Sequence, residues 1–200
     1  MNQSLKVRRL VEAAMIAAIY TVLTYAAAAL NLAYQGVQFR FSEALTILPV
    51  FTPSAIPGLA IGCFLSNLGS PMGIIDWISG TSATLLAAVL TRLLRNLTVK
   101  GLPVLAPFPP VLTNAVIVGC VIAVTDPAGF SVPLFAAMAL SVGLGELAVC
   151  YGLGLPLIAV LKKTGVSKRI FLESQESPKR LIYHTLTASQ KRTVTLHGNR

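Results

Sequence analysis

Several charged residues of this chain lie within or beside long apolar stretches, where removing a charge from water costs free energy. Glu43, Asp76, Asp126 and Glu146 are acids of this kind, and Arg40 is the one cation that lies apart from the three basic clusters of the sequence. A charge persists in apolar surroundings when a partner offsets its desolvation. These residues are therefore candidates for binding a polar ligand.

Glu146 is the strongest candidate. It lies roughly 20 Å along a helix expected to begin at Pro133, at about 1.5 Å per residue, and Gly143 and Cys150 one turn away are small enough to leave room for a flat ligand. Its two oxygens match two adjacent N–H donors, as on a guanine-like edge. Asn114, on the preceding helix, has a donor and an acceptor for a carbonyl side. Alternatively, Glu146 forms an internal hydrogen bond to another helix.

Polar residues alternate with apolar ones in residues 37–41, so in an extended segment Gln38 and Arg40 face one way. Such a segment could close over a pocket that also contains Glu43. The alternative is a solvated outer loop in which Arg40 pairs with Glu43.

Asp76 and Trp77 begin another expected helix, and Asn67 begins the turn before it. Asp76 is either a ligand-binding carboxylate or the N-cap of its helix. Trp77 is either a stacking platform for a planar base or an anchor at the membrane interface.

The distribution of cations predicts a membrane protein. Hydrophobic residues make up 54% of the 200 residues and charged residues 12%, and residues 41–91 and 101–161 contain no Lys or Arg. By the positive-inside rule, the three flanking clusters lie in the cytoplasm, with both termini and an even number of spans. The net charge of +9 lies mainly beside apolar runs and in the tail, which favours an anionic cell-membrane leaflet over nucleic acid as the partner.

Six apolar segments are expected, at residues 10–32, 43–51, 53–68, 76–96, 110–124 and 133–161. The second and third are too short to cross a bilayer alone and are interpreted as a dipping pair joined at Thr52. The fold class is thus an all-α integral membrane protein with a six-segment helical bundle. Residues 1–165 form the membrane domain, and residues 166–200 form a basic, flexible cytoplasmic tail.

Several chemistries find no support in the sequence. There is no G-x-x-x-x-G-K-[ST] loop for ATP, and His184 and His197 both lie in the tail, away from any bundle nucleophile. The three cysteines lack metal-type spacing. We expect no enzyme activity, metal or cofactor in this chain.

Small residues at four-residue spacing mark one region of the first helix, namely Ala13, Ala14, Ala17 and Ala18. This spacing lets another helix approach closely. The partner is either a helix of the same bundle or a separate subunit.

The order of polar, Pro and Gly positions over residues 4–165 resembles the QueT family. The resemblance rests on VQFRFSEALT (37–46), PSAIPGLAIGC (53–63), Asn67, Asp76, TNAVIVG (113–119), GEL (145–147) and GLGLP (152–156). It implies the substrate-binding S component of an energy-coupling-factor transporter for a queuosine precursor, a 7-deazaguanine base. Residues 166–200 depart from the family.

The resemblance also implies partners. These are a transmembrane coupling subunit, which docks on the alanine face, and two ATPase subunits, which use the ATP. The alternatives are an S component for another small heterocycle or vitamin, and a non-transporting membrane scaffold in which Glu146 is structural.

Overall fold

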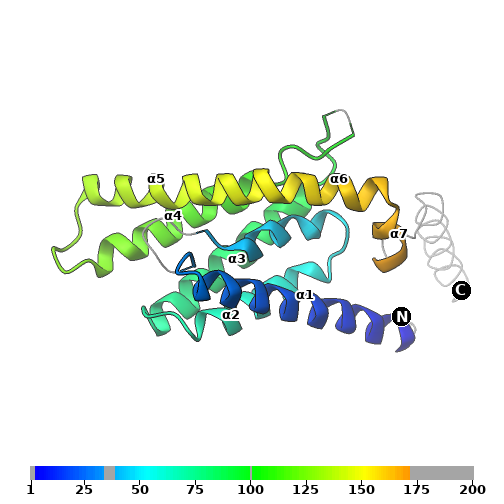
Figure 1. Cartoon of the computed structure of the whole chain (residues 1–200), viewed down its shortest axis with the longest axis horizontal. Coiled ribbons are helices and arrows are strands. Elements are labelled where there is room, and N and C mark those ends of the chain that lie inside the picture. Colours follow the sequence, from blue (N-terminus) through cyan, green and yellow to red (C-terminus); the bar gives the residue numbers. More distant parts are fainter. Residues whose placement is uncertain (1–2, 34–38, 100, 172–200) are drawn as a thin grey trace, which may run out of the picture.

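The computed structural model describes residues 3–33, 39–99 and 101–171, and within them every regular element is helical (Figure 1). Four helices are long and apolar enough to span a bilayer: α1 (Gln3–Ala29), α3 (Ile74–Leu94), α4 (Phe108–Thr125) and the continuous helix Val132–Lys163. Two shorter apolar helices, η1 (Phe41–Val50) and α2 (Ala55–Asn67), complete the set. The predicted all-α membrane fold with six apolar segments is confirmed.

The last span contains a change of helical pitch. It consists of α5 (Val132–Val149), a single π-helical segment η2 (Cys150–Gly154) and α6 (Leu155–Lys163). Figure 1 shows α5 and α6 following each other as one rod. Buried residues recur along it at four-residue spacing, at Glu146, Cys150, Gly154 and Ile158.

The short helix η1 lies inside the bundle. It is a ten-residue 3-10 helix, seven of whose residues are buried, and it contacts α1, α2, α3, α5, η2 and α6. At about 2 Å rise per residue it extends roughly 20 Å, too short to cross the hydrocarbon region. Its polar side chains, including Glu43 and Thr46, therefore point into the protein.

Close contact between α1 and α2 fixes the wall beside η1. A Cβ atom added at Gly58 would lie 2.7 Å from the carbonyl oxygen of Ala13, and one at Gly62 would lie 2.9 Å from that of Ala17. Only glycine allows the two backbones to approach this closely. The two helices therefore pack as a rigid pair.

The three groups of cations that flank the apolar runs lie at one end of the molecule. Lys162 Nζ donates to the Gly101 carbonyl at 2.9 Å, and Arg92 Nη1 donates to the Pro49 carbonyl at 2.9 Å. In Figure 1 the N-terminal end of α1 lies at the same end as α6 and α7. This arrangement fits the charge map, which assigns that end to the cytoplasm.

The residues after α6 turn back onto the bundle. Helix α7 (Val166–Ile170) follows Gly165, and the ring of Phe171 stacks on Phe51 with centroids 5.8 Å apart. The predicted tail thus begins with a short helix, after which Phe171 packs against the membrane domain. Residues 172–200 lie outside the described residues, and the domain boundary at residue 165 stays a prediction.

The α1–α2 contact predicts a stability difference between two glycines. Gly58→Ala should lower the free energy of unfolding by about 1–3 kcal/mol, because its methyl group overlaps backbone atoms. Gly152→Ala, where no atom lies within 4 Å, serves as the matched control. Unfolding in detergent measures both, and equal stability of the two variants would contradict the close contact.

Orientation can be tested from two exposed turns. In a Cys120→Ala background, Ala128→Cys on the α4–α5 turn should react with an impermeant thiol reagent added to intact cells, and Thr98→Cys after α3 should not. These positions avoid Gly101 and Gly129, whose positive φ angles disfavour a side chain. Reaction at Thr98→Cys alone would reverse the predicted topology.

Candidate functional site

Buried polar side chains from six elements meet in the interior of the bundle. We call this set the polar layer; each of its members is at most 5% exposed. It comprises Tyr20 of α1, Arg40 and Glu43 at η1, Asn67 of α2, Asp76 of α3, Asn114 of α4 and Glu146 of α5. Six of these seven were predicted from the sequence as binding residues, and the structure brings them together.

Arg40 organises one side of the polar layer. Its Nη1 donates to Asn67 Oδ1 at 3.3 Å, its Nη2 lies 3.8 Å from Asp76 Oδ2, and its Nε donates to the Ala33 carbonyl at 3.1 Å. Asn67 in turn donates to the Asp76 carbonyl at 3.1 Å. Arg40 is therefore buried and contacts several residues, so the alternative of a solvated outer loop is wrong.

Asp76 belongs to the first turn of α3 without capping it. The N-cap is Gly73, with φ of 64°, and Asp76 is the third helical residue. Because the helix starts two residues earlier than predicted, the carboxylate points inward to Arg40. The N-cap interpretation of Asp76 is therefore wrong.

Glu146 and Asn114 form the opposite side of the polar layer. Asn114 Nδ2 donates to Glu146 Oε1 at 2.8 Å, and the Cys150 thiol lies 3.5 Å from Glu146 Oε2. The internal hydrogen bond considered from the sequence is thus present. The Asn114 amide is the donor to Glu146 Oε1, and the Cys150 thiol, a weak donor, is the neighbour of Oε2.

Gly143 does not provide the free space that its size suggested. A Cβ atom at this position would meet Ala115 Cβ at 3.3 Å. Gly143 therefore serves the packing of α5 on α4. The expectation that it makes room for a ligand is wrong.

Glu43 lies between the two sides. The Tyr20 hydroxyl donates to Glu43 Oε1, whereas Oε2 has no hydrogen-bond partner in the described part of the chain. The Cys150 thiol approaches the Glu43 backbone carbonyl at 3.6 Å. Sequence reasoning missed Tyr20 and Cys150 as members of this network; a tyrosine in the middle of an apolar span was the available signal.

Two further predicted residues are not placed in the polar layer. Trp77 is half-buried and meets Phe64 of α2 edge to face, with centroids 6.4 Å apart. Its Nε1 has no partner among the described residues. Gln38 lies outside the described residues, so its predicted role is untested.

The alanine set divides between two faces of α1. Ala13 and Ala17 are buried against Gly58 and Gly62, which is packing within the bundle. Ala14 and Ala18 are exposed. Packing within the bundle is thus confirmed for Ala13 and Ala17, and docking on a separate subunit stays a prediction for Ala14 and Ala18.

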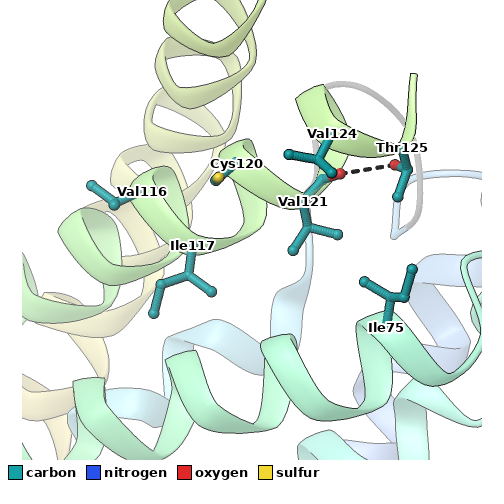
Figure 2. A pocket seen from close by; sticks show the side chains of 7 residues that line it. All are labelled: Ile75, Val116, Ile117, Cys120, Val121, Val124 and Thr125. Atoms are coloured by element: carbon teal, nitrogen blue, oxygen red, sulfur yellow. Dashed lines mark hydrogen bonds between the residues drawn. The ribbon is translucent and has the colours of Figure 1, made fainter. Parts of the chain in front are cut away.

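A separate groove of about 410 Å³ lies between α3 and α4 (Figure 2). Its lining is apolar except for the Thr125 hydroxyl, which donates to the Val121 carbonyl at 2.8 Å, and the Cys120 thiol. None of the polar layer's residues line it. It does not fit a ligand with several hydrogen-bonding groups.

Bilayer-length helices that enclose a layer of polar side chains define an integral membrane protein, and buried polar groups at that depth are candidates for a substrate site. A family model described as the QueT transporter matches residues 10–163. The chain therefore belongs to the QueT transporter family, a family of energy-coupling-factor S components, and the sequence resemblance is confirmed. No curated protein and no solved structure matched the chain.

The buried ion pair predicts an asymmetric effect on stability. Arg40→Met should lower the free energy of unfolding by about 3–5 kcal/mol, because it leaves the Asp76 carboxylate buried without its cation. Adding Asp76→Asn should recover part of the loss. Asp126→Asn, on the α4–α5 turn, is the control, and equal unfolding temperatures for the single and double variants would contradict the pairing.

Proposed function

We propose that this chain is the membrane-embedded substrate-binding subunit for uptake of a queuosine precursor, a 7-deazaguanine base. Family membership supports the transport role. The observation that carries the substrate class is the pairing of Glu146 with Asn114 inside the polar layer. A carboxylate and an amide that lie side by side match a planar heterocycle with adjacent N–H donors and a carbonyl.

In this proposal Glu146 accepts hydrogen bonds from the N–H edge of the base. Its Oε2 contacts only the Cys150 thiol in the described residues, a weak donor that a ligand N–H can replace. Asn114 holds Oε1 and fixes the plane of the carboxylate. Charge-assisted hydrogen bonds of this kind are stronger than neutral ones and give orientation as well as affinity.

Energy for uptake comes from partners in this proposal. The sequence has no phosphate-binding loop, so ATP is used by two ATPase subunits joined through a transmembrane coupling subunit. Ala14 and Ala18 form an open small-residue face on α1 for that coupling subunit. Substrate enters from outside and is released inward.

One observation favours a different role, that of a membrane scaffold. The Asn114–Glu146 bond satisfies one oxygen of Glu146 internally and would also serve to hold α4 on α5. Retention of a heterocycle during purification separates the two roles. A scaffold would purify without one.

Glu146→Gln tests the contact with the base. It preserves shape but replaces one acceptor with a donor that opposes the ligand's N–H, at a cost of roughly 1–3 kcal/mol or more. Affinity should fall at least about tenfold, since about 1.4 kcal/mol is one decade. Calorimetry in detergent should compare both proteins with ligands that have or lack the exocyclic amine. If the loss of affinity caused by Glu146→Gln and the loss caused by removing the exocyclic amine simply add, Glu146 does not contact that edge.

The docking face gives an independent test. Ala14→Trp or Ala18→Trp should block assembly with the coupling subunit but leave ligand binding by the isolated chain intact, because the bulk lies on the exposed side of α1. Ala137→Trp, on the exposed side of α5, is the matched control for an added tryptophan. Assembly of the Ala14 and Ala18 variants at control level would exclude this face as the interface.

A further inference from the structure

A groove of about 430 Å³ runs between α1 and α2 at the end of the molecule where the basic clusters lie. None of its described lining residues belongs to the polar layer or to the groove between α3 and α4. We call it the basic groove. Its lining comes from α1, from α2 and from the two residues before α2, and consists of Lys6, Arg9, Leu10, Ala13, Pro53, Ser54, Pro57 and Ile61.

The two ends of the basic groove differ in polarity. Helices α1 and α2 run in the same direction, since Gly58 lies against Ala13 and Gly62 lies against Ala17. Residues early in either helix therefore lie at the basic end, and later ones lie further along the bundle. The lining follows this order, with Lys6, Arg9 and Ser54 near the helix starts and Leu10, Ala13, Pro57 and Ile61 beyond them. The groove is thus polar at its mouth and apolar along its length.

The mouth of the basic groove is positively charged. Lys6 and Arg9 are exposed and lie three residues apart, which places them on one side of α1. No acid is among the described residues that line the groove. Glu12 of the same helix is buried and accepts a hydrogen bond from the Thr52 hydroxyl at 3.0 Å. Ser54 adds a hydroxyl that makes no capping hydrogen bond to α2. These groups suit an anion.

The apolar part of the groove has a fixed shape. The ring of Pro57 restricts the backbone in the first turn of α2, and the contact of Gly58 with Ala13 holds the two helices together. Leu10 and Ile61 are 71% and 51% exposed, as expected for side chains that contact acyl chains. A ligand that fits both parts of the groove needs an anionic head and a hydrocarbon chain, and a soluble anion lacks the second.

We propose that the basic groove binds an anionic phospholipid from the leaflet at the basic end of the bundle. The headgroup phosphate lies on Lys6 and Arg9, and one acyl chain follows Leu10 and Ile61. Basic pockets between membrane helices on the cytoplasmic side bind anionic headgroups in this way. The lipid contacts both members of the α1–α2 pair. Because it binds them only when they are packed together, it stabilises their contact. The proposal does not depend on the substrate of the chain.

The test compares two lipids with the same acyl chains, dioleoylphosphatidylglycerol and dioleoylphosphatidylcholine. Native mass spectrometry of the full chain, titrated with each lipid in a neutral detergent, should show at least about tenfold tighter binding of the first phosphatidylglycerol. Lys6→Gln combined with Arg9→Gln should remove this preference by weakening phosphatidylglycerol alone. Arg8→Gln combined with Lys163→Gln is the matched control, because it removes two exposed cations outside the groove and should keep the preference.

The apolar part of the groove has its own test. Ile61→Trp should weaken phosphatidylglycerol binding at least about fivefold, because the indole occupies the path of the acyl chain. Ile78→Trp, on the exposed side of α3, is the control and should change binding less than about twofold. Inorganic phosphate at millimolar concentration should not displace the lipid. Displacement by phosphate would assign the groove to a soluble anion and overturn the proposal.

Three further outcomes would overturn it. One is equal affinity of the unaltered chain for the two lipids. Another is an equal loss of phosphatidylglycerol binding in the groove variant and in its charge-matched control. The third is normal lipid binding by the Lys6 and Arg9 variant together with failed assembly on the coupling subunit, which would make the groove a protein interface. Both cations are exposed, so their replacement leaves the α1–α2 packing intact, and Ile61→Trp tests the same groove with the cations present.

Discussion

Removal of charged groups from water dominates the architecture of this protein. Each buried ion costs several kcal/mol unless partners replace its hydration. The chain meets that cost for Asp76 with Arg40, and for Glu146 with Asn114. Six different elements contribute to the polar layer, so the spans are held together by these contacts as well as by apolar packing. The lipid-facing surfaces, by contrast, need only be hydrophobic.

The 3-10 helix η1 makes such a polar interior possible. A full-length span would present polar groups at many depths, but this ten-residue segment is surrounded by the longer helices along its buried length. Arg40 and Glu43 enter the bundle from its first turn. Helix α1, which packs closely on α2 beside η1, carries Tyr20 on its inner face and Ala14 and Ala18 on its outer face. This one helix therefore connects the candidate site with the candidate docking surface.

Much of the fold was predictable because apolar length and the positions of cations are local properties of the sequence. All six apolar segments and most members of the polar layer were identified in this way. Partners across helices were not predictable, because a 3.6-residue period gives the face of a side chain but not what it meets. Thus Gly143 packs on Ala115, Trp77 packs on Phe64, and Tyr20 joins Glu43. The pairing of Ala13 and Ala17 with two glycines likewise required the structure.

The π-helical segment η2 sets the register of the last span. In an uninterrupted α-helix, residues four apart drift by about 40° per step, so Ile158 would lie about 120° around the axis from Glu146. The wider π turn absorbs most of that drift, which keeps Glu146, Cys150, Gly154 and Ile158 on the buried side. The number of residues in this segment is therefore constrained more tightly than their identity. Loss of one residue would rotate α6 relative to α5 by about a quarter turn, so the face of α6 that is now buried would no longer continue the buried face of α5 that carries Glu146.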